Sequence, residues 1–198
     1  YEIPFGYMER VNDGREYPAL NWVDISDQEY GISLLSNLKH GFNVQGNTIS
    51  VTLIRTAYEP DPKPDTGIHS FTYSLFPHKG DFKPAGTVQK GYELNHPLMA
   101  FLINNKGGQL PDCKSFIHIS ASNVILSCFK QAEGDENLIL RVYESHGLEV
   151  ECSINLGFEF QSVEEVDLME KKLRAVKLDG KSNEFSFNIN PMEIKTFK

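Results

Sequence analysis

The chain has 198 residues, of which 40% are hydrophobic and 23% charged, so it can hold one large β domain or two small ones around a genuine core. A formal net charge of −8, without any basic run, argues against nucleic acid as a partner. No apolar run approaches the roughly 20 residues that span a bilayer, which argues against a membrane partner.

The first residues, Tyr1 to Gly6, show neither the basic stretch nor the apolar segment of a signal peptide, and no initiator Met precedes them. We therefore expect a fragment of a longer protein. The three cysteines, Cys113, Cys128 and Cys152, have no zinc-finger spacing and predict neither a disulfide framework nor a metal site. Without a signal peptide or an Asn-x-Ser/Thr sequon, the expected location is cytoplasmic.

Alternating apolar and polar residues predict β-strands along most of the chain. Ile49, Val51 and Leu53 share one face of the first such stretch, and Phe71, Tyr73 and Leu75 share one face of the second. Turn sequences rich in Gly and Asn separate the stretches. In chain order, the clearest predicted strands are 48–55, 69–75, 138–143, 148–156, 185–189 and 193–197.

One segment, 164–173, is a helical candidate, because Val166, Met169 and Leu173 fit a spacing of three to four; its flanks suit a strand equally. Many short strands with frequent turns predict an all-β chain of antiparallel sandwich architecture. The Gly-rich break around residues 104–111 predicts two β domains, 1–106 and 107–198.

A long irregular loop, 56–68, separates the first two predicted strands and carries three prolines and the acidic residues Glu59, Asp61 and Asp65. Loops of this length in compact domains are often functional. Arg55 continues the apolar face before the loop, and His69 begins the apolar face after it. If the two strands pair as a hairpin, Arg55 and His69 lie close together beneath the acidic loop.

An Arg on a packed face needs a partner or a cavity, since an isolated buried charge is too costly. The functional interpretation is a cluster of Arg55, Asp61, Asp65 and His69 that binds a sugar or faces a neighbouring active site. The structural interpretation is an ion pair that pins the loop. The residues alone leave both open.

Other candidate groups are less specific. His78 follows Pro77 on the face opposite to His69, and no His spacing typical of metal ligands exists, so we predict no metal site in this chain. Trp22, the single tryptophan, is either a sugar-stacking platform or a core anchor. Paired carboxylates could serve glycoside hydrolysis, but spacing selects no pair among Asp24, Asp27, Asp61, Asp65, Glu144, Asp167 and Glu170.

The most specific series of motifs runs from Leu53-Ile54-Arg55 through Pro60-Asp61-Pro62 and Asp65-Thr66-Gly67-Ile68-His69 to Pro77-His78. This series resembles the C-terminal region of glycoside hydrolase family 38 α-mannosidases. Further matches, in chain order, are Trp22 to Asp27, Tyr30 to Leu35, Lys39 to Phe42, Tyr92 to Leu98, Arg141 to Gly147 and Pro191 to Thr196. The first twenty residues depart from the family's usual pattern.

The resemblance implies a fold and an activity. It implies the end of a large galactose-mutarotase-like supersandwich followed by a smaller terminal sandwich. It also implies retaining hydrolysis of terminal α-mannosides by a zinc-dependent catalytic domain upstream in the same polypeptide. No catalytic residue, zinc ligand or cofactor is carried over to this chain, because the motifs that hold them are absent. Related enzymes bring side chains of the β region to the pocket, which favours Arg55, Asp61, Asp65 and His69 as substrate-binding candidates.

Three functions remain to be separated. The first is the non-catalytic β portion of an α-mannosidase, with the α-mannoside substrate and the upstream domain as partners. The second is a stand-alone carbohydrate-binding β-sandwich module that stacks sugars on Trp22 and exposed tyrosines. The third is a structural β domain that mediates contacts in a homo-oligomer.

Overall fold

A computed structural model describes residues 1–104, 107–178, 180 and 182–198. The chain divides into two compact units, Tyr1–Met99 (unit 1) and Ala100–Lys198 (unit 2). The boundary predicted from sequence, after residue 106, falls at residues 105–106, which lie outside the described part of the chain. Both units are built of antiparallel sheets, so the prediction of an all-β sandwich chain is confirmed.

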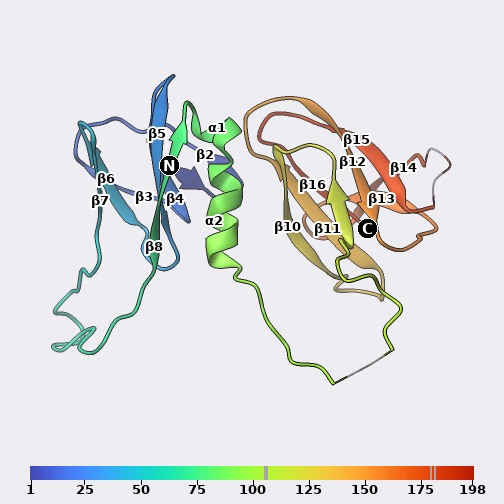
Figure 1. Ribbon diagram of the computed structural model, residues 1–198, viewed down its shortest axis with the longest axis horizontal. Helices are drawn as coiled ribbons and strands as arrows, with labels where there is room; N and C mark the ends of the chain where they lie inside the picture. The colour runs from blue at the N-terminus through green and yellow to red at the C-terminus, as the bar shows by residue number, and fades with distance from the viewer. Residues whose placement is uncertain (105–106, 179, 181) are drawn as a thin grey trace. The chain divides into compact units, whose positions relative to one another are not determined.

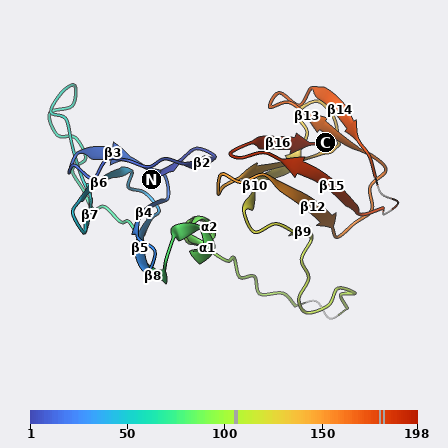
Figure 2. The ribbon, with the colours of Figure 1, turned by 90° about the horizontal axis from the view of Figure 1, so that it is seen from above.

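Unit 1 contains a two-stranded ribbon, two three-stranded sheets of order β3-β6-β7 and β4-β5-β8, and two helices (Figure 1). The elements are β1 (Glu2–Ile3), β2 (Gly6–Tyr7), β3 (Glu16–Pro18), β4 (Trp22–Ser26), β5 (Tyr30–Ser36), β6 (Gly41–Gln45), β7 (Thr48–Val51), β8 (Tyr73–Lys79), α1 (Phe82–Ala85) and α2 (Thr87–Asn95). Figure 2 shows the two three-stranded sheets as separate layers.

The core of unit 1 lies between these two sheets. Val23 and Leu34 point from one sheet toward Phe42 and Val44 of the other, and all four are buried. The opposite face of β4 and β5 carries Trp22, whose ring centroid lies 5.0 Å from that of Phe82 in α1. The helices therefore cover the outer face of the sheet β4-β5-β8.

Helices α1 and α2 were not predicted from the sequence. Asp81 caps α1 by accepting a hydrogen bond from the Lys83 N–H at 2.8 Å, and Gly86 ends it with a φ of 82°. Gly91 of α2 approaches the sheet so closely that a Cβ there would lie 3.0 Å from the Trp22 ring. Pro84, Gly86 and Gly91 interrupt the apolar periodicity of this segment, which is why no helix was expected.

Unit 2 is a sandwich of a five-stranded sheet, β10-β11-β16-β13-β14, and a three-stranded sheet, β15-β12-β9. The strands are β9 (Ile117–Ile119), β10 (Val124–Gln131), β11 (Leu138–Glu144), β12 (Val150–Leu156), β13 (Val163–Val166), β14 (Lys172–Val176), β15 (Glu184–Ile189) and β16 (Ile194–Phe197). The predicted alternation is confirmed in β12 and β15, where Cys152, Ile154, Phe185 and Ile189 are buried.

The segment 164–173 forms no helix, and of the two alternatives left open by the sequence the strand holds at both of its ends. Strands β13 and β14 pair antiparallel and are joined by a turn. The carboxylate of Asp167 accepts hydrogen bonds from the Met169 N–H at 2.8 Å and the Lys171 N–H at 2.9 Å, which closes the turn. The spacing of Val166, Met169 and Leu173 resembled a helical stripe because a tight turn interrupts the strand alternation.

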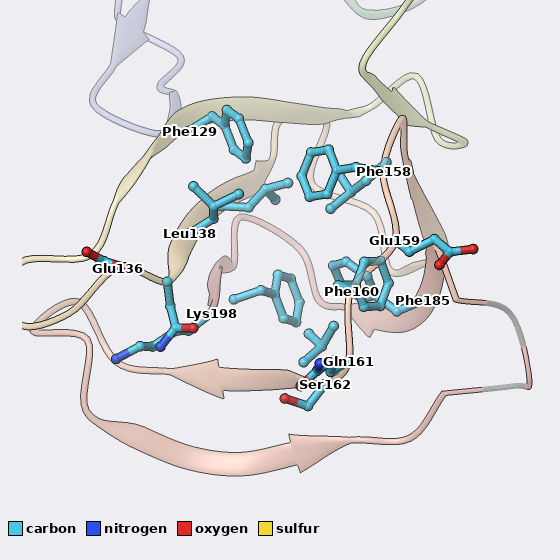
Figure 3. A pocket seen from close by; sticks show the side chains of 15 residues that line it. Phe129, Glu136, Leu138, Phe158, Glu159, Phe160, Gln161, Ser162, Phe185 and Lys198 are labelled. Atoms are coloured by element: carbon cyan, nitrogen blue, oxygen red, sulfur yellow. The ribbon is translucent and has the colours of Figure 1, made fainter.

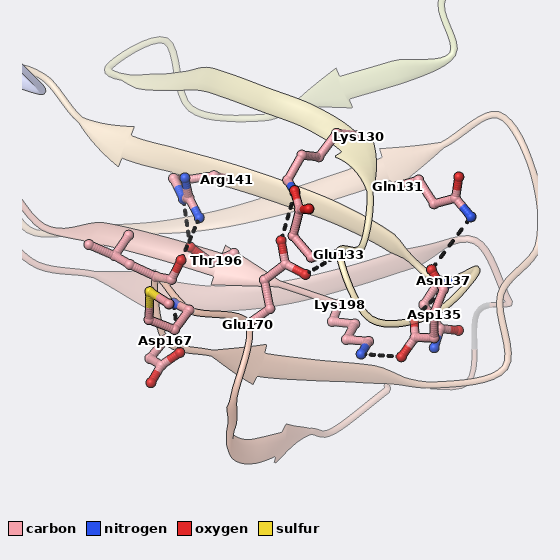
Figure 4. A network of polar contacts seen from close by, with 12 residues as sticks. Lys130, Gln131, Glu133, Asp135, Asn137, Arg141, Asp167, Glu170, Thr196 and Lys198 are labelled. Atoms are coloured by element: carbon pink, nitrogen blue, oxygen red, sulfur yellow. Dashed lines mark hydrogen bonds and ion pairs between the residues drawn. The ribbon is translucent and has the colours of Figure 1, made fainter.

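A polar network fixes this turn to the hairpin of β10 and β11 (Figure 4). Glu170 accepts a hydrogen bond from the Glu133 N–H at 2.7 Å and pairs with Lys130 at 2.8 Å. Arg141 of β11 donates to the Thr196 hydroxyl at 2.9 Å.

Neither of the two helices in the described residues has the length and apolar character that crossing a membrane requires.

Candidate functional site

The candidate site from sequence is the long loop of unit 1, which the structure extends to residues 52–72. Strand β7 ends at Val51 and β8 begins at Tyr73, so Arg55 and His69 lie in the loop and not at strand ends. The condition that the two flanking strands pair as a hairpin is not met, because β7 pairs with β6 and β8 pairs with β5 in the other sheet. The loop therefore connects two sheets, and its length follows from that crossing.

The four candidate side chains are all exposed. His69 Nε2 donates to the backbone carbonyl of Asp65 at 2.7 Å, and the Asp61 carboxylate accepts from the Lys63 N–H at 2.9 Å. No ion pair between Arg55 and Asp61 or Asp65 occurs in the described part of the chain. The structure brings Asp65 and His69 together through a backbone contact and leaves the guanidinium group of Arg55 exposed.

The ends of the loop are held by the sheets. Thr52 N–H donates to the Gly41 carbonyl at 2.8 Å, and the Thr72 N–H donates to the Asn37 side chain at 2.8 Å. The Lys39 ammonium lies 5.0 Å from the centre of the Phe71 ring. Between these anchors the loop extends away from the strands, as its path shows in Figure 1. Such an arrangement suits contacts with a ligand or surface beyond unit 1.

Strand β8, which follows the loop, carries a buried polar cluster that the sequence did not reveal. His78 Nε2 donates to Asp24 Oδ2 at 2.8 Å, and both side chains are only 4% exposed. Ser33 Oγ donates to the same carboxylate oxygen at 2.7 Å and lies 2.7 Å from Thr87 Oγ1 at the start of α2. Asp24, Ser33, His78 and Thr87 thus join three strands to a helix.

His78 lacks the geometry of a catalytic relay. Its Nε2 is the atom that approaches both Asp24 and Ser33, whose hydroxyl lies 3.2 Å away, whereas a relay uses both ring nitrogens. Its Nδ1 is buried without a hydrogen-bond partner. A Cβ on Gly31 would lie 2.1 Å from the His78 ring, so only glycine permits this packing. The cluster is a structural anchor of unit 1.

Trp22 is a core residue. Its side chain is 1% exposed and lies beneath α1, so it offers no face for a sugar. Of the two alternatives for Trp22, the core anchor therefore holds and the stacking platform does not.

Glu144, a candidate carboxylate, is fully buried at the end of β11 and binds the backbone of two loops. Its oxygens accept hydrogen bonds from the N–H groups of His146 and Gly147, each at 2.7 Å, and of Met192 at 3.0 Å. The Asn123 amide donates a fourth bond at 2.8 Å. Burial raises the pKa of this carboxyl, but the backbone donors Met192 and His146, with Asn123, outweigh burial and lower the pKa below its ordinary value.

Unit 2 also contains a hollow at one end of its sandwich, with a volume of about 420 Å³ (Figure 3). Phenylalanines from both sheets and from the segment after β12 line it, among them Phe129, Phe158 and Phe160. Glu136 and Glu159 also line it. A hollow of this kind suits an apolar or aromatic group.

No group of three or more His, Cys, Asp or Glu side chains in the described residues lies close enough to hold a metal ion. Zinc, which the resemblance implies for the longer enzyme, therefore has no fitting ligand set among them.

Comparison with protein families identifies the chain's class. The model described as "Glycosyl hydrolases family 38 C-terminal domain" matches residues 1–63. The model described as "Glycosyl hydrolases family 38 C-terminal beta sandwich domain" matches residues 123–197. Together the two cover most of the chain, and they define it as the C-terminal β region of a glycosyl hydrolase.

Individual relatives support the same family as the two family models. The chain is 35% identical over 99% of its length to Alpha-mannosidase 2C1 of Mus musculus and 33% identical over its whole length to Alpha-mannosidase G of Dictyostelium discoideum. It spans about a fifth of the length of these relatives. An alpha-mannosidase structure from Enterococcus faecalis V583 shares the fold, with a TM-score of 0.83 at 19% identity over 99% of this chain and 23% of that one. The chain belongs to glycosyl hydrolase family 38.

Proposed function

We propose that this chain is the C-terminal, non-catalytic β portion of a larger retaining α-mannosidase that removes terminal α-mannosyl groups. The observation that carries the proposal is the 35% identity to an α-mannosidase over 99% of the chain. In the longer polypeptide, an upstream domain supplies the catalytic carboxylates and the zinc ion. The cytoplasmic location and the oligomeric state stay predictions.

Within that enzyme, we assign the loop 52–72 to the sugar or aglycone side of the pocket. Its four candidate side chains are exposed, and the hydrogen bonds of Asp61 and His69 go to the backbone of the loop itself, so the loop is available to the upstream domain or to substrate. The Arg55 guanidinium group can donate several hydrogen bonds to hydroxyl or carboxylate oxygens, and Asp65 can accept from sugar hydroxyls. The structural interpretation, an ion pair pinning the loop, receives no support, because Arg55 has no acidic partner in the described residues.

Replacing Arg55 or Asp65 by Ala in the longer enzyme is expected to lower kcat/KM for an aryl α-mannoside by roughly 10- to 100-fold, the effect of losing one charge-assisted hydrogen bond. Thermal stability should not change, because both side chains are exposed. Lys63→Ala, an exposed charge in the same loop, is the matched control and should leave kcat/KM unchanged. Unchanged kcat/KM in a folded Arg55→Ala and Asp65→Ala pair would remove these residues from the pocket.

A further inference from the structure

Two neighbouring strands of unit 2, β13 and β16, carry charged side chains at positions that face the core (Figure 1). Lys195 shares a face of β16 with the buried Phe197, and Glu165 shares a face of β13 with the buried Val163. The side chains of Lys195 and Glu165 are only 5% and 11% exposed. Buried ion pairs can often be replaced by apolar residues without loss of stability, so stability alone does not explain these charges.

The two buried charges belong to a network that continues to the surface. Glu165 Oε1 accepts a hydrogen bond from the Lys195 ammonium at 2.9 Å, and Glu165 Oε2 accepts two from the Arg174 guanidinium, at 2.9 and 2.6 Å. Lys195 also pairs with Glu193 at 3.1 Å. Glu193 Oε2 accepts hydrogen bonds from the backbone N–H and the side-chain amide of Asn190, at 2.7 and 2.9 Å. The network therefore holds the exposed Arg174 and Asn190 in place.

The same network lines a hollow of about 470 Å³ in unit 2, a volume in the range of small-molecule sites. Leu173 and the exposed Asn188 complete its walls. In the described part of the chain the Asn188 amide makes no hydrogen bond. The guanidinium group of Arg174 has five N–H donors, of which Glu165 takes two. The hollow thus presents polar groups that are held in position and still able to bind a ligand.

The charge of the network indicates the class of ligand. Burial raises the pKa of Glu165 and of Glu193, but Lys195 with Arg174 in the first case, and the Asn190 N–H with Lys195 in the second, outweigh burial and lower both pKa values. Both carboxylates are therefore ionised at neutral pH, and they cancel the two positive charges. A wall without net charge favours neither an anion nor a cation. It suits a neutral sugar, whose hydroxyls donate to carboxylate or amide oxygens and accept from amide or guanidinium groups.

We propose that this hollow binds a second mannose residue of the substrate, separate from the one that is hydrolysed. Arg174, Asn188 and Asn190 hydrogen-bond its hydroxyls, and Leu173 contacts the apolar side of its ring. The inference rests on the proposed function, which makes an α-mannoside the sugar that the protein meets. It also gives a role to the motif from Pro191 to Thr196, which supplies the buried ammonium group and one carboxylate of the network.

Titration of the 198-residue chain with methyl α-mannoside, followed by NMR of isotope-labelled protein, tests the site apart from catalysis. The side-chain amide signals of Asn188 and Asn190 and the backbone signals of β14 should shift, with a Kd on the order of 1 mM for a ligand of this size. Inorganic phosphate should shift none of these signals. No shift at about ten times that concentration of mannoside would overturn the proposal. Equal shifts with phosphate would assign the hollow to an anion and overturn it as well.

Substitutions locate the sugar. Asn188→Ala should weaken the binding of methyl α-mannoside by about 3- to 10-fold, the loss of one neutral hydrogen bond. Asn137→Ala, which removes an exposed amide from the other hollow of unit 2, is the matched control and should leave the Kd unchanged. An effect of Asn137→Ala as large as that of Asn188→Ala would contradict the proposal.

Arg174→Ala should weaken the same binding by about 10- to 100-fold, because it removes charge-assisted hydrogen bonds. It also leaves Glu165 with one partner fewer, which can prevent folding. In that case Arg174→Lys is used. It keeps the positive charge but loses the planar fork of donors, so binding should weaken in the same direction. A folded Arg174 variant that binds as tightly as the wild type would contradict the proposal.

Kinetics of the longer polypeptide give an independent readout. Asn188→Ala should raise KM for an oligomannoside by about 3- to 10-fold and leave kcat unchanged, because the site adds binding without taking part in the reaction. An aryl α-mannoside has a single sugar, so both of its constants should stay as in the wild type. An unchanged KM for the oligomannoside would contradict the proposal.

Failure of this site and failure of the proposed function give different results. A longer polypeptide that hydrolyses an aryl α-mannoside, while the 198-residue chain binds no mannoside, rejects only the sugar site. Binding by the chain together with a folded but inactive longer polypeptide rejects the α-mannosidase assignment and retains a sugar site in unit 2.

Discussion

Replacing Glu144 by Ala is expected to lower the free energy of unfolding of unit 2 by about 3–5 kcal/mol, the cost of removing one partner from a buried charged network. The substitution leaves the N–H groups of His146, Gly147 and Met192 and the Asn123 amide without their acceptor inside the protein. A domain is stable by only about 5–15 kcal/mol, so the loss takes a large share of the total. Urea unfolding followed by circular dichroism measures the change.

The exposed Glu149 provides the control, since Glu149→Ala removes a carboxylate from the same loop, two residues after the bonded Gly147. It should change the unfolding free energy by less than about 0.5 kcal/mol. Glu144→Gln should fall between the two, because the amide keeps one acceptor oxygen. A Glu144→Ala protein as stable as the control would show that the loops do not depend on this carboxylate.

The same residue predicts a pH dependence. Its pKa is lowered from 4.5 in the folded state, so it stabilises the fold at pH values above the unfolded pKa, and the contribution is lost as pH falls through the folded pKa. Burial raises the pKa of Glu165, but the side chains of Lys195 and Arg174 outweigh it and lower that pKa too. We therefore expect wild-type stability to decline below about pH 4.5, and less steeply in Glu144→Gln.

Replacing Asp24 by Ala is expected to lower the free energy of unfolding of unit 1 by about 2–4 kcal/mol. The carboxylate accepts hydrogen bonds from Ser26 at 2.6 Å, Ser33 at 2.7 Å and His78 at 2.8 Å. The His78 donor lies in a side chain that is 4% exposed, so water cannot fully replace the lost acceptor. Fluorescence of Trp22, the single tryptophan, reports unfolding of this unit selectively.

Two further substitutions test the origin of the effect. Gly31→Ala should destabilise unit 1 without touching the carboxylate, because the new Cβ would displace the His78 ring from Asp24. Glu29→Ala, at an exposed turn position beside β5, is the control and should have little effect. If Asp24→Ala and Glu29→Ala unfold at the same urea concentration, the cluster contributes nothing to stability.

The strands could be predicted from sequence wherever one face is buried and the other exposed. In β12 and β15 the side chains alternate between core and surface, so residues such as Ile154 and Phe187 mark the strands clearly. The α2 segment could not be predicted, because Gly91 is required by the approach to Trp22, a contact between residues far apart in sequence. The segment 164–173 left helix and strand open for a related reason: Asp167 forms a turn that local periodicity cannot distinguish from a helical stripe.

The candidate site shows the same limit of local sequence patterns, which do not reveal contacts between residues far apart in the chain. The loop around Asp61 and Asp65 could be recognised from its prolines and charges, but not the pairing of its flanking strands with two different sheets. The Asp24–His78 pair spans 54 residues and is visible only in three dimensions.

The motif from Arg141 to Gly147 has a physical explanation that the spacing of its residues alone did not supply. Glu144 binds the Gly147 N–H, and Gly147 adopts a φ of 76°, which favours glycine.

The most direct test of the proposed function compares hydrolysis of an aryl α-mannoside by the longer polypeptide and by the 198-residue chain under the same conditions. The expected result is hydrolysis by the longer polypeptide, with preference over the aryl β-mannoside and α-glucoside, and none by the chain alone. Hydrolysis by the chain alone would contradict its non-catalytic role. A folded longer polypeptide without α-mannoside hydrolysis would contradict the assignment of an α-mannosidase.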